Sequence, residues 1–213
     1  MFKLLFLALT LIGLNESFAQ QKSGYIKYSI DVIVLDTTPE NLNVGRLLRD
    51  SKIELFVTEN NYRVESYTGP FGSSSMICDY SKGQILTLST NTMGKYARIT
   101  TIKDALKKPE KIVTNTVVNR DRQRKILGFN CYYVELTENG STGKFWCTDE
   151  IDFRLQGQSF MSESLQGYPL SIQKEDSGFQ FTYTASNFID RIDNPEITFS
   201  LEIPEGYTMI PNN

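Results

Sequence analysis

The dominant feature of this sequence is an alternation of apolar and polar residues along short segments. In residues 25–34 one side of an extended chain carries only apolar side chains, namely Ile26, Tyr28, Ile30, Val32 and Val34. The other side carries Lys27, Ser29 and Asp31 in its first half. Because successive side chains of a β-strand point to opposite faces, this pattern predicts a strand with one buried face.

Similar runs recur along the chain, rich in Ile, Val, Thr, Tyr and Phe and separated by turn-forming pairs such as Asn-Gly and Lys-Gly. The further predicted strands are 52–59, 62–67, 75–80, 84–89, 96–100, 114–119, 131–137, 144–148, 170–173, 179–185 and 197–203. Helical signals are few and short, at 41–50, at 102–108 before Pro109, and at 152–159.

A strand meander of this length must bury one face of its sheet, in a barrel, in a sandwich, or around a few helices. The sparse helical signals favour the last arrangement. We therefore predict a mainly β fold, a curved antiparallel sheet that forms a half-barrel with a few short helices. No repeat or linker divides the chain, so residues 20–213 are expected to form a single β-rich domain.

The amino terminus has the pattern of a secretory signal peptide. Lys3 precedes an apolar run from Leu4 to Leu14, and Ser17-Phe18-Ala19 supplies small residues at a cleavage site. The run is shorter than the roughly 20 apolar residues that span a bilayer. We expect residues 1–19 to be removed, so that the chain is not transmembrane after cleavage and is periplasmic or secreted.

Composition excludes several kinds of chemistry. The sequence contains no His, which removes Ser-His-Asp and Cys-His mechanisms and the usual catalytic zinc sites. It has no C-x-x-C pair and no phosphate-binding loop motif, so we expect no cofactor and no metal site. The net charge of −3 gives no long-range attraction for nucleic acid.

Two groups of charged residues leave alternatives open. The segment RDRQRK, Arg120 to Lys125, could bind an anionic ligand, but its alternating charges favour a solvated loop. The acids Asp149, Glu150 and Asp152 follow Trp146, and Asp190 and Asp193 flank Arg191. A carboxylate-based hydrolase is conceivable from these acids, although clustered acids at strand ends usually mark solvated turns.

The segment from Cys131 to Cys147 predicts a β-hairpin around Asn139-Gly140. A two-residue turn would place the two sulfurs on opposite faces, whereas a three-residue loop over 138–140 places them opposite each other. We expect the second register, with Cys131 and Cys147 joined in a disulfide and Cys78 left as a buried free thiol. Three reduced, buried cysteines remain the alternative.

Four motifs together resemble a known group: KILGFNC (125–131), FWCT (145–148), GYPL (167–170) and IPEGY (203–207). Their order and spacing are similar to a secreted family of unknown function that neighbours the GLPGLI proteins and is related to the LolA/LolB-like lipoprotein carriers. The resemblance implies a LolA-like curved sheet with an apolar concave side, which in the carriers receives acyl chains. Gly167-Tyr168-Pro169 is followed by Leu170-Ser171-Ile172, which departs from the GLPGLI pattern.

These observations predict a non-enzymatic exported protein that binds an apolar or lipid-like ligand in the concavity of its sheet. The candidate lining residues are Tyr132, Val134, Trp146, Phe181 and Tyr183, because they alternate onto aromatic faces. The same residues could instead form a filled core. The protein would then be an envelope module that docks a partner protein through a sheet edge or an aromatic patch.

Overall fold

The structure is a computed structural model that describes residues 20–105, 107, 112–153, 162 and 164–211. Its strands are β1 (Gly24–Val34), β2 (Lys52–Val57), β3 (Asn61–Tyr67), β4 (Ser73–Asp79), β5 (Gln84–Asn91), β6 (Gly94–Thr101), β7 (Val113–Ile126), β8 (Phe129–Glu138), β9 (Ser141–Thr148), β10 (Tyr168–Asp176), β11 (Phe179–Ile189) and β12 (Thr208–Met209). Its helices are α1 (Pro39–Leu47), α2 (Ile102–Ala105), α3 (Pro195–Thr198) and the single 3₁₀ turn η1 (Gly69–Phe71).

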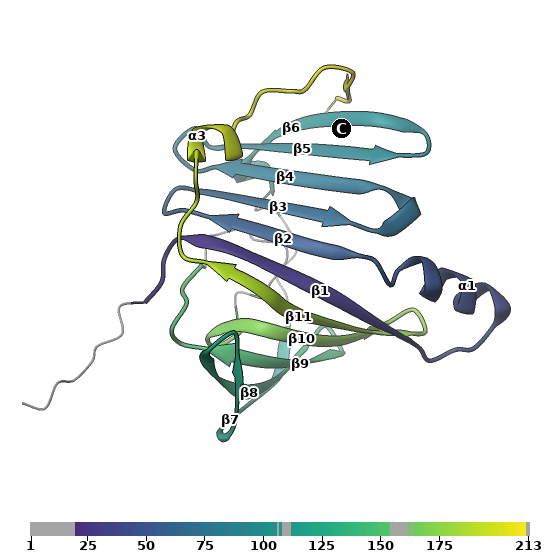
Figure 1. Ribbon diagram of the computed structural model, residues 1–213, viewed down its shortest axis with the longest axis vertical. Coiled ribbons are helices and arrows are strands. Elements are labelled where there is room, and N and C mark those ends of the chain that lie inside the picture. The colour runs from purple at the N-terminus through teal and green to yellow at the C-terminus, as the bar shows by residue number, and fades with distance from the viewer. Residues whose placement is uncertain (1–19, 106, 108–111, 154–161, 163, 212–213) are drawn as a thin grey trace, which may run out of the picture.

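All twelve strands belong to one sheet, in the order β12-β6-β5-β4-β3-β2-β1-β11-β10-β9-β8-β7. Neighbouring strands are antiparallel except for the short parallel pair of β12 and β6. Figure 1 shows this open sheet curling at the end formed by β7, β8 and β9. The predicted fold class, mainly β with a curved antiparallel sheet and a few short helices, is therefore confirmed.

The alternation seen in the sequence separates the two faces of the sheet. We call the face that carries Ile26 and Tyr28 the inner face and the face that carries Tyr25 and Lys27 the outer face. Ile26 and Tyr28 are fully buried, and their cross-strand partners on β2 are Leu55 and Ile53. One buried cluster on this side joins residues from β1 to β5 with Tyr168 and Leu170 of β10, so the core follows the inner curve of the sheet.

The outer face has a second core, which the sequence did not reveal. Ile77, Leu86, Leu88 and Ala97 are buried on β4, β5 and β6, and Phe199 packs against them. The predicted strand 197–203 is wrong, because this segment instead begins in α3 and then runs over the outer face, with Leu201 and Ile203 in contact with the cluster. In Figure 1 the yellow chain after β11 passes the ends of β1 to β5 before it reaches β6.

The β8–β9 hairpin has the register that we did not expect. Glu138 pairs with Ser141, so the turn contains only Asn139 and Gly140. Both residues have positive φ angles, 49° and 78°, as a type I′ turn requires. The predicted three-residue loop is wrong because this turn already matches the twist of the two strands.

This register also corrects the predicted disulfide. Cys147 lies opposite Tyr132, and adjacent residues of a strand point to opposite faces, so Cys131 does not share the cross-strand position of Cys147. Cys78, Cys131 and Cys147 are all described, and all three are buried and outside any disulfide.

The basic segment at Arg120 is part of a strand, which contradicts the predicted loop. β7 continues through it with a bulge, because Asn119 pairs with Tyr133 while Gln123 pairs with the next residue of β8, Tyr132. The side chain of Asn119 supports the bulge by accepting hydrogen bonds from the backbone N–H groups of Asp121 and Arg122, at 3.1 and 2.9 Å.

The helices lie near their predicted positions. α1 begins with Pro39 at its first turn, and the Thr38 hydroxyl caps it by accepting from the Asn41 backbone N–H at 3.2 Å. α2 covers the first part of the predicted helix at 102–108. The predicted signal peptide and most of the predicted helix at 152–159 lie outside the described residues. Within the described ranges, no helix has the length and apolar character needed to cross a membrane.

Candidate functional site

The inner face carries a row of aromatic side chains along β11. Phe179, Phe181 and Tyr183 are spaced two residues apart and therefore point the same way. Their ring centroids are 5.9 Å apart for the first pair and 6.4 Å apart for the second. Burial raises the pKa of the Tyr183 phenol above its ordinary value, and the charge of Asp176 adds to this effect.

Aliphatic residues of β1 extend this row across the sheet. Ile30 lies opposite Tyr183, and Val32 lies opposite Phe181. These four side chains are half-buried. At the end of the row, α1 packs closely on β1, because a Cβ atom on Gly45 would lie 2.5 Å from a methyl carbon of Val34. We call Ile30, Val32, Phe181 and Tyr183 the inner row.

Tyr132 and Val134, two of the predicted lining residues, are part of the packed core. Tyr132 is 5% exposed and Val134 is fully buried, in a cluster with Leu136, Phe145 and Ile172. Tyr183 packs against the edge of the same cluster. The structure therefore places Tyr132, Val134, Phe181 and Tyr183 on one face but leaves only Phe181 and Tyr183 partly exposed.

Trp146 does not belong to this group. It lies opposite Tyr133 on the outer face, with ring centroids 5.5 Å apart. The guanidinium groups of Arg122 and Arg124 lie over its indole ring at 5.3 and 4.8 Å. The prediction that Trp146 lines the same surface as Val134 is wrong, because it assumed the other hairpin register.

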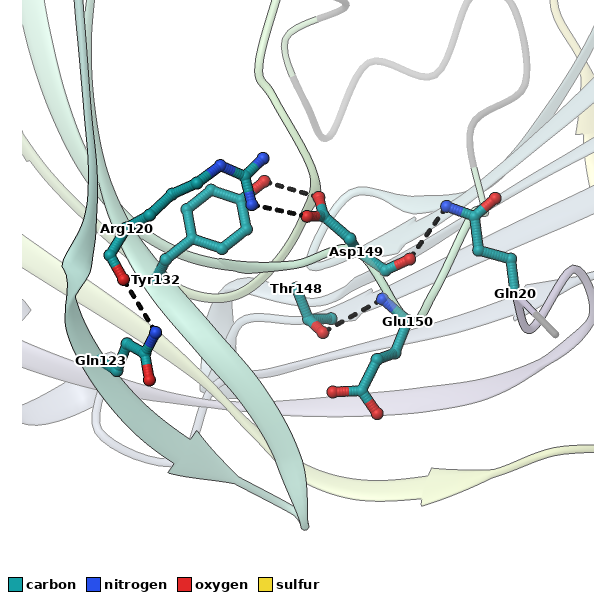
Figure 2. A network of polar contacts seen from close by, with 7 residues as sticks. All are labelled: Gln20, Arg120, Gln123, Tyr132, Thr148, Asp149 and Glu150. Carbon is teal, nitrogen blue, oxygen red and sulfur yellow. Dashed lines mark hydrogen bonds and ion pairs between the residues drawn. The ribbon is translucent and has the colours of Figure 1, made fainter. Parts of the chain in front are cut away.

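A polar network anchors Tyr132 at the rim of the inner face (Figure 2). The Tyr132 hydroxyl donates to Asp149 Oδ1 at 2.7 Å, and Arg120 Nη1 contacts Asp149 Oδ2 at 2.8 Å. The Arg120 guanidinium also lies 4.2 Å from the centre of the Tyr132 ring. Burial raises the pKa of the Tyr132 phenol, and its hydrogen bond to the Asp149 carboxylate raises it further.

Hydrogen bonds to the backbone hold the surrounding chain in place. Gln20 Nε2 donates to the Asp149 carbonyl at 2.9 Å, and Gln123 Nε2 donates to the Arg120 carbonyl at 2.9 Å. The Glu150 carboxylate accepts from the Asn130 backbone N–H at 2.8 Å. The network thus joins the bulge of β7 to the segment that follows β9.

This network borders a hollow of about 280 Å³, lined by Arg120, Gln123, Asn130, Cys131, Tyr132, Asp149 and Glu150. Both of its carboxylates already accept hydrogen bonds from neighbouring groups. These hydrogen bonds hold Tyr132 and Asn130 in position. Asp193, from the other acidic group, pairs with Arg191 at 3.7 Å in a largely exposed turn.

The roles of Arg120, Arg122 and Arg124 were not predicted from the sequence. Arginines at every second position of RDRQRK match the alternation of a strand, but the bulge interrupts it, so Arg120 lies over Tyr132 while Arg122 and Arg124 lie over Trp146 on the outer face. Their aromatic partners come from β8 and β9, and only the tertiary structure shows which arginine lies over which ring.

The family described as "Domain of unknown function (DUF4412)" matches residues 48–201 of the chain. Structures of PNGF-II in the P21 and C2 space groups are 12% and 14% identical to it, with TM-scores of 0.46 and 0.43. These matches take in 89% and 87% of this chain but 31% and 30% of the PNGF-II chains. The chain thus spans about a third of the length of PNGF-II.

The LolA superfamily protein NE2245 from Nitrosomonas europaea is also among the similar solved structures. It is 14% identical, with a TM-score of 0.25 over 84% of this chain and 90% of its own. No curated protein matches the chain. Identities and TM-scores this low carry no conclusion about function.

Proposed function

The chain belongs to the DUF4412 family, and we propose that it is an exported, non-enzymatic protein that binds an apolar or lipid-like ligand on the inner face of its sheet. The observation that carries this proposal is the inner row. Its four apolar side chains, on two adjoining strands, are only half-buried. Apolar surface that remains open to water gains free energy when a ligand covers it, at about 25 cal/mol per Å².

The geometry of the row suits an extended acyl chain. Phe181 and Tyr183 follow each other along β11, and Val32 and Ile30 run beside them on β1. Together they form an apolar strip that is parallel to the strands and two side chains wide. Each methylene group laid along this strip contributes about 0.8 kcal/mol when it leaves water.

The side chain of a lysine lies beside this strip. Lys174 pairs with Phe181 in the β10–β11 register, so both side chains are on the inner face. Its ammonium group is 5.8 Å from the centre of the Phe145 ring. Asp176 pairs with Phe179 on the same face, so a head group at this end of the strip would meet both a positive and a negative charge.

Export rests on the amino-terminal pattern of Lys3, the apolar run and Ala19. It would bring the protein to the compartment in which acylated ligands must cross water between membranes. Fractionation of cells that express the full chain, followed by intact-mass measurement, tests this part. The expected product is a periplasmic or secreted chain that begins at Gln20, and a cytoplasmic chain with an intact amino terminus would contradict it.

Binding is tested with cis-parinaric acid, a fluorescent fatty acid, and by mass spectrometry of lipids extracted from the purified protein. Phe181→Asp should weaken binding of the fatty acid at least about tenfold, because it places a charge in the strip. The matched control is Thr182→Asp, the next residue of the same strand, which points to the outer face. The control should bind like the unaltered protein.

Two results would count against the proposal. One is the absence of both co-purified lipid and fatty-acid binding in a folded protein. The other is equal weakening by Phe181→Asp and Thr182→Asp, since that would indicate a general loss of stability. Trp146 is a poor reporter for this test because it lies on the outer face.

A second candidate function, an envelope module that binds a partner protein, is favoured by one observation. β7 is an edge strand of the sheet, and Val113 and Val117 are exposed on it. Such an edge can accept a strand from another chain. Crosslinking in the envelope should then capture one specific partner, and Val117→Pro should abolish the capture; recovery of no specific partner would exclude this function.

A further inference from the structure

A second hollow lies on the outer face, away from the inner row and from the Arg120 network. Strands β2, β3 and β4 form its floor, and Pro204 and Tyr207 of the carboxyl-terminal segment form a wall. It encloses about 280 Å³. The Tyr207 hydroxyl lies 3.1 Å from the Thr90 hydroxyl, which fixes this wall to β5. Two segments that are far apart in the sequence therefore build one concave surface.

The charged side chains of this hollow neutralise one another. Lys52 Nζ lies 3.0 Å from Glu54 Oε1, and Arg63 Nη2 forms an ion pair with Glu65. Glu54 and Glu65 are direct cross-strand partners. The pKa of Tyr25 is raised to about 12 by burial and, next, by the charges of these two glutamates. A charged ligand would have to compete with an existing ion pair, whereas an uncharged ligand would not.

Two polar atoms at this hollow have no hydrogen-bond partner within the part of the chain that the structure describes. They are Arg63 Nε and Ser75 Oγ, and both atoms are inaccessible to solvent. The other nitrogens of Arg63 are engaged, because Nη1 donates to the Thr198 carbonyl at 2.9 Å and Nη2 contacts Glu65. Buried polar atoms in native proteins nearly always have partners, so this pair points to a group that supplies an acceptor and a donor.

A hydroxyl group supplies both an acceptor and a donor of hydrogen bonds. The hollow also offers apolar surface, from Leu88, Pro204 and the half-exposed ring of Tyr67. A ligand with hydroxyl groups on its edge and C–H groups on its faces matches this mixture of surfaces. The volume is slightly below the roughly 300–1,000 Å³ of pockets for drug-sized ligands, which suits one sugar ring.

We propose that this outer hollow binds an uncharged saccharide: the Ser75 and Arg63 side chains, whose Oγ and Nε atoms are covered in the free protein, turn to hydrogen-bond its hydroxyl groups, and Tyr67 packs against its ring. The carboxylates of Glu54 and Glu65 accept hydrogen bonds from further hydroxyl groups. The site is independent of the inner row, so acyl-chain binding and saccharide binding do not require each other.

The test is an NMR titration of the isotope-labelled chain 20–213 with glucose, galactose and N-acetylglucosamine. At least one of these sugars should shift the backbone amide signals of β2, β3 and β4, while glucuronate and glycine should shift them less. Ser75→Ala and Arg63→Lys should each weaken that binding about tenfold, because each removes one hydrogen bond to the sugar. The control is Ser89→Ala, on β5, whose partner Ser74 is adjacent to Ser75 and therefore on the other face.

The Ser75→Ala variant distinguishes a loss of sugar binding from a loss of folding. Because the Ser75 hydroxyl has no partner in the free protein, its removal should leave the unfolding temperature unchanged or raise it. Saccharides that leave the signals of β2 to β4 unmoved would overturn the proposal. So would full binding by Ser75→Ala, or tighter binding of glucuronate or glycine than of every neutral sugar.

Discussion

The guanidinium group of Arg120 lies 4.2 Å over the ring of Tyr132, and both side chains meet the same carboxylate, that of Asp149. Arg120 is largely exposed, whereas Tyr132 is buried up to its hydroxyl. The carboxylate therefore connects a solvated charge on β7 to a phenol that belongs to the core.

Asp149→Asn tests the strength of this connection. The substitution removes an exposed ion pair and replaces a charged acceptor of the Tyr132 hydroxyl by a neutral one, so we expect the free energy of unfolding to fall by about 1 kcal/mol. Urea denaturation measures this change in the free energy of unfolding. Asp193→Asn is the control, because its ion pair with Arg191 is about 80% exposed on both sides and should change stability by less than about 0.5 kcal/mol. Equal effects of the two variants would show that the hydrogen bond from Tyr132 to the Asp149 carboxylate does not stabilise the fold.

Gly140→Ala tests the left-handed conformation of the hairpin turn. Gly140 has φ 78°, a left-handed conformation in which a Cβ atom costs roughly 1–2 kcal/mol. Calorimetry should show a loss of stability of that size, while Ser141→Ala, just after the turn, should be nearly neutral. In the three-residue loop Gly140 would also be left-handed, so the register itself is read from NMR contacts between Tyr132 and Cys147. Contacts between Cys131 and Cys147 instead would contradict the structure.

The thiols provide a third prediction. Burial raises the pKa of Cys78 and of Cys131 to about 11, so both remain protonated and unreactive at pH 8. A colorimetric thiol reagent should modify the native protein slowly and should count three thiols in urea, as many as the chain has cysteines. A count of one in urea without reductant would show that a disulfide had formed.

Alkaline unfolding tests the environment of Tyr25. In the unfolded chain this phenol loses its proton near its ordinary pKa of 10, whereas in the folded protein it keeps it until about 12. The folded state therefore binds more protons in this window, and stability falls as pH rises from 10 to 12. Tyr25→Phe should lose less stability than the unaltered protein over the same range. Parallel curves for the two proteins would mean that neither burial nor the charges of Glu54 and Glu65 raise the pKa of this phenol.

Period-two alternation predicted most of the sheet, because strands with one buried face must alternate, as β1 does from Ile26 to Val34. It failed where both faces are covered. Arginine covers Trp146 and the core covers Phe145, so both are shielded from solvent. Their apolar character therefore could not show which of the two points to the inner face. The segment at Phe199 reads as a strand in sequence because its apolar residues alternate, yet it covers the outer core without joining the sheet there.

The candidate sites were less predictable than the fold. Phe181 and Tyr183 were identified because they alternate on one strand, which is a local property. The outer hollow depends on the contact of Pro204 and Tyr207 with strands that precede them by more than a hundred residues, and nothing local indicates it. One wrong residue of register in the β8–β9 hairpin was enough to misplace Trp146 and to suggest a disulfide.

The position of β1 between β2 and β11 has a kinetic consequence. Strands β2 to β6 and β7 to β11 are each neighbours in the sheet in the order in which they follow along the chain, so each half could form on its own. Only the first strand of the chain bridges them, and its partner β11 is among the last segments to be synthesised. Closure of such a distant contact is slow, so the newly made chain should spend its early lifetime without a finished sheet, which is the state that the proposed export would require.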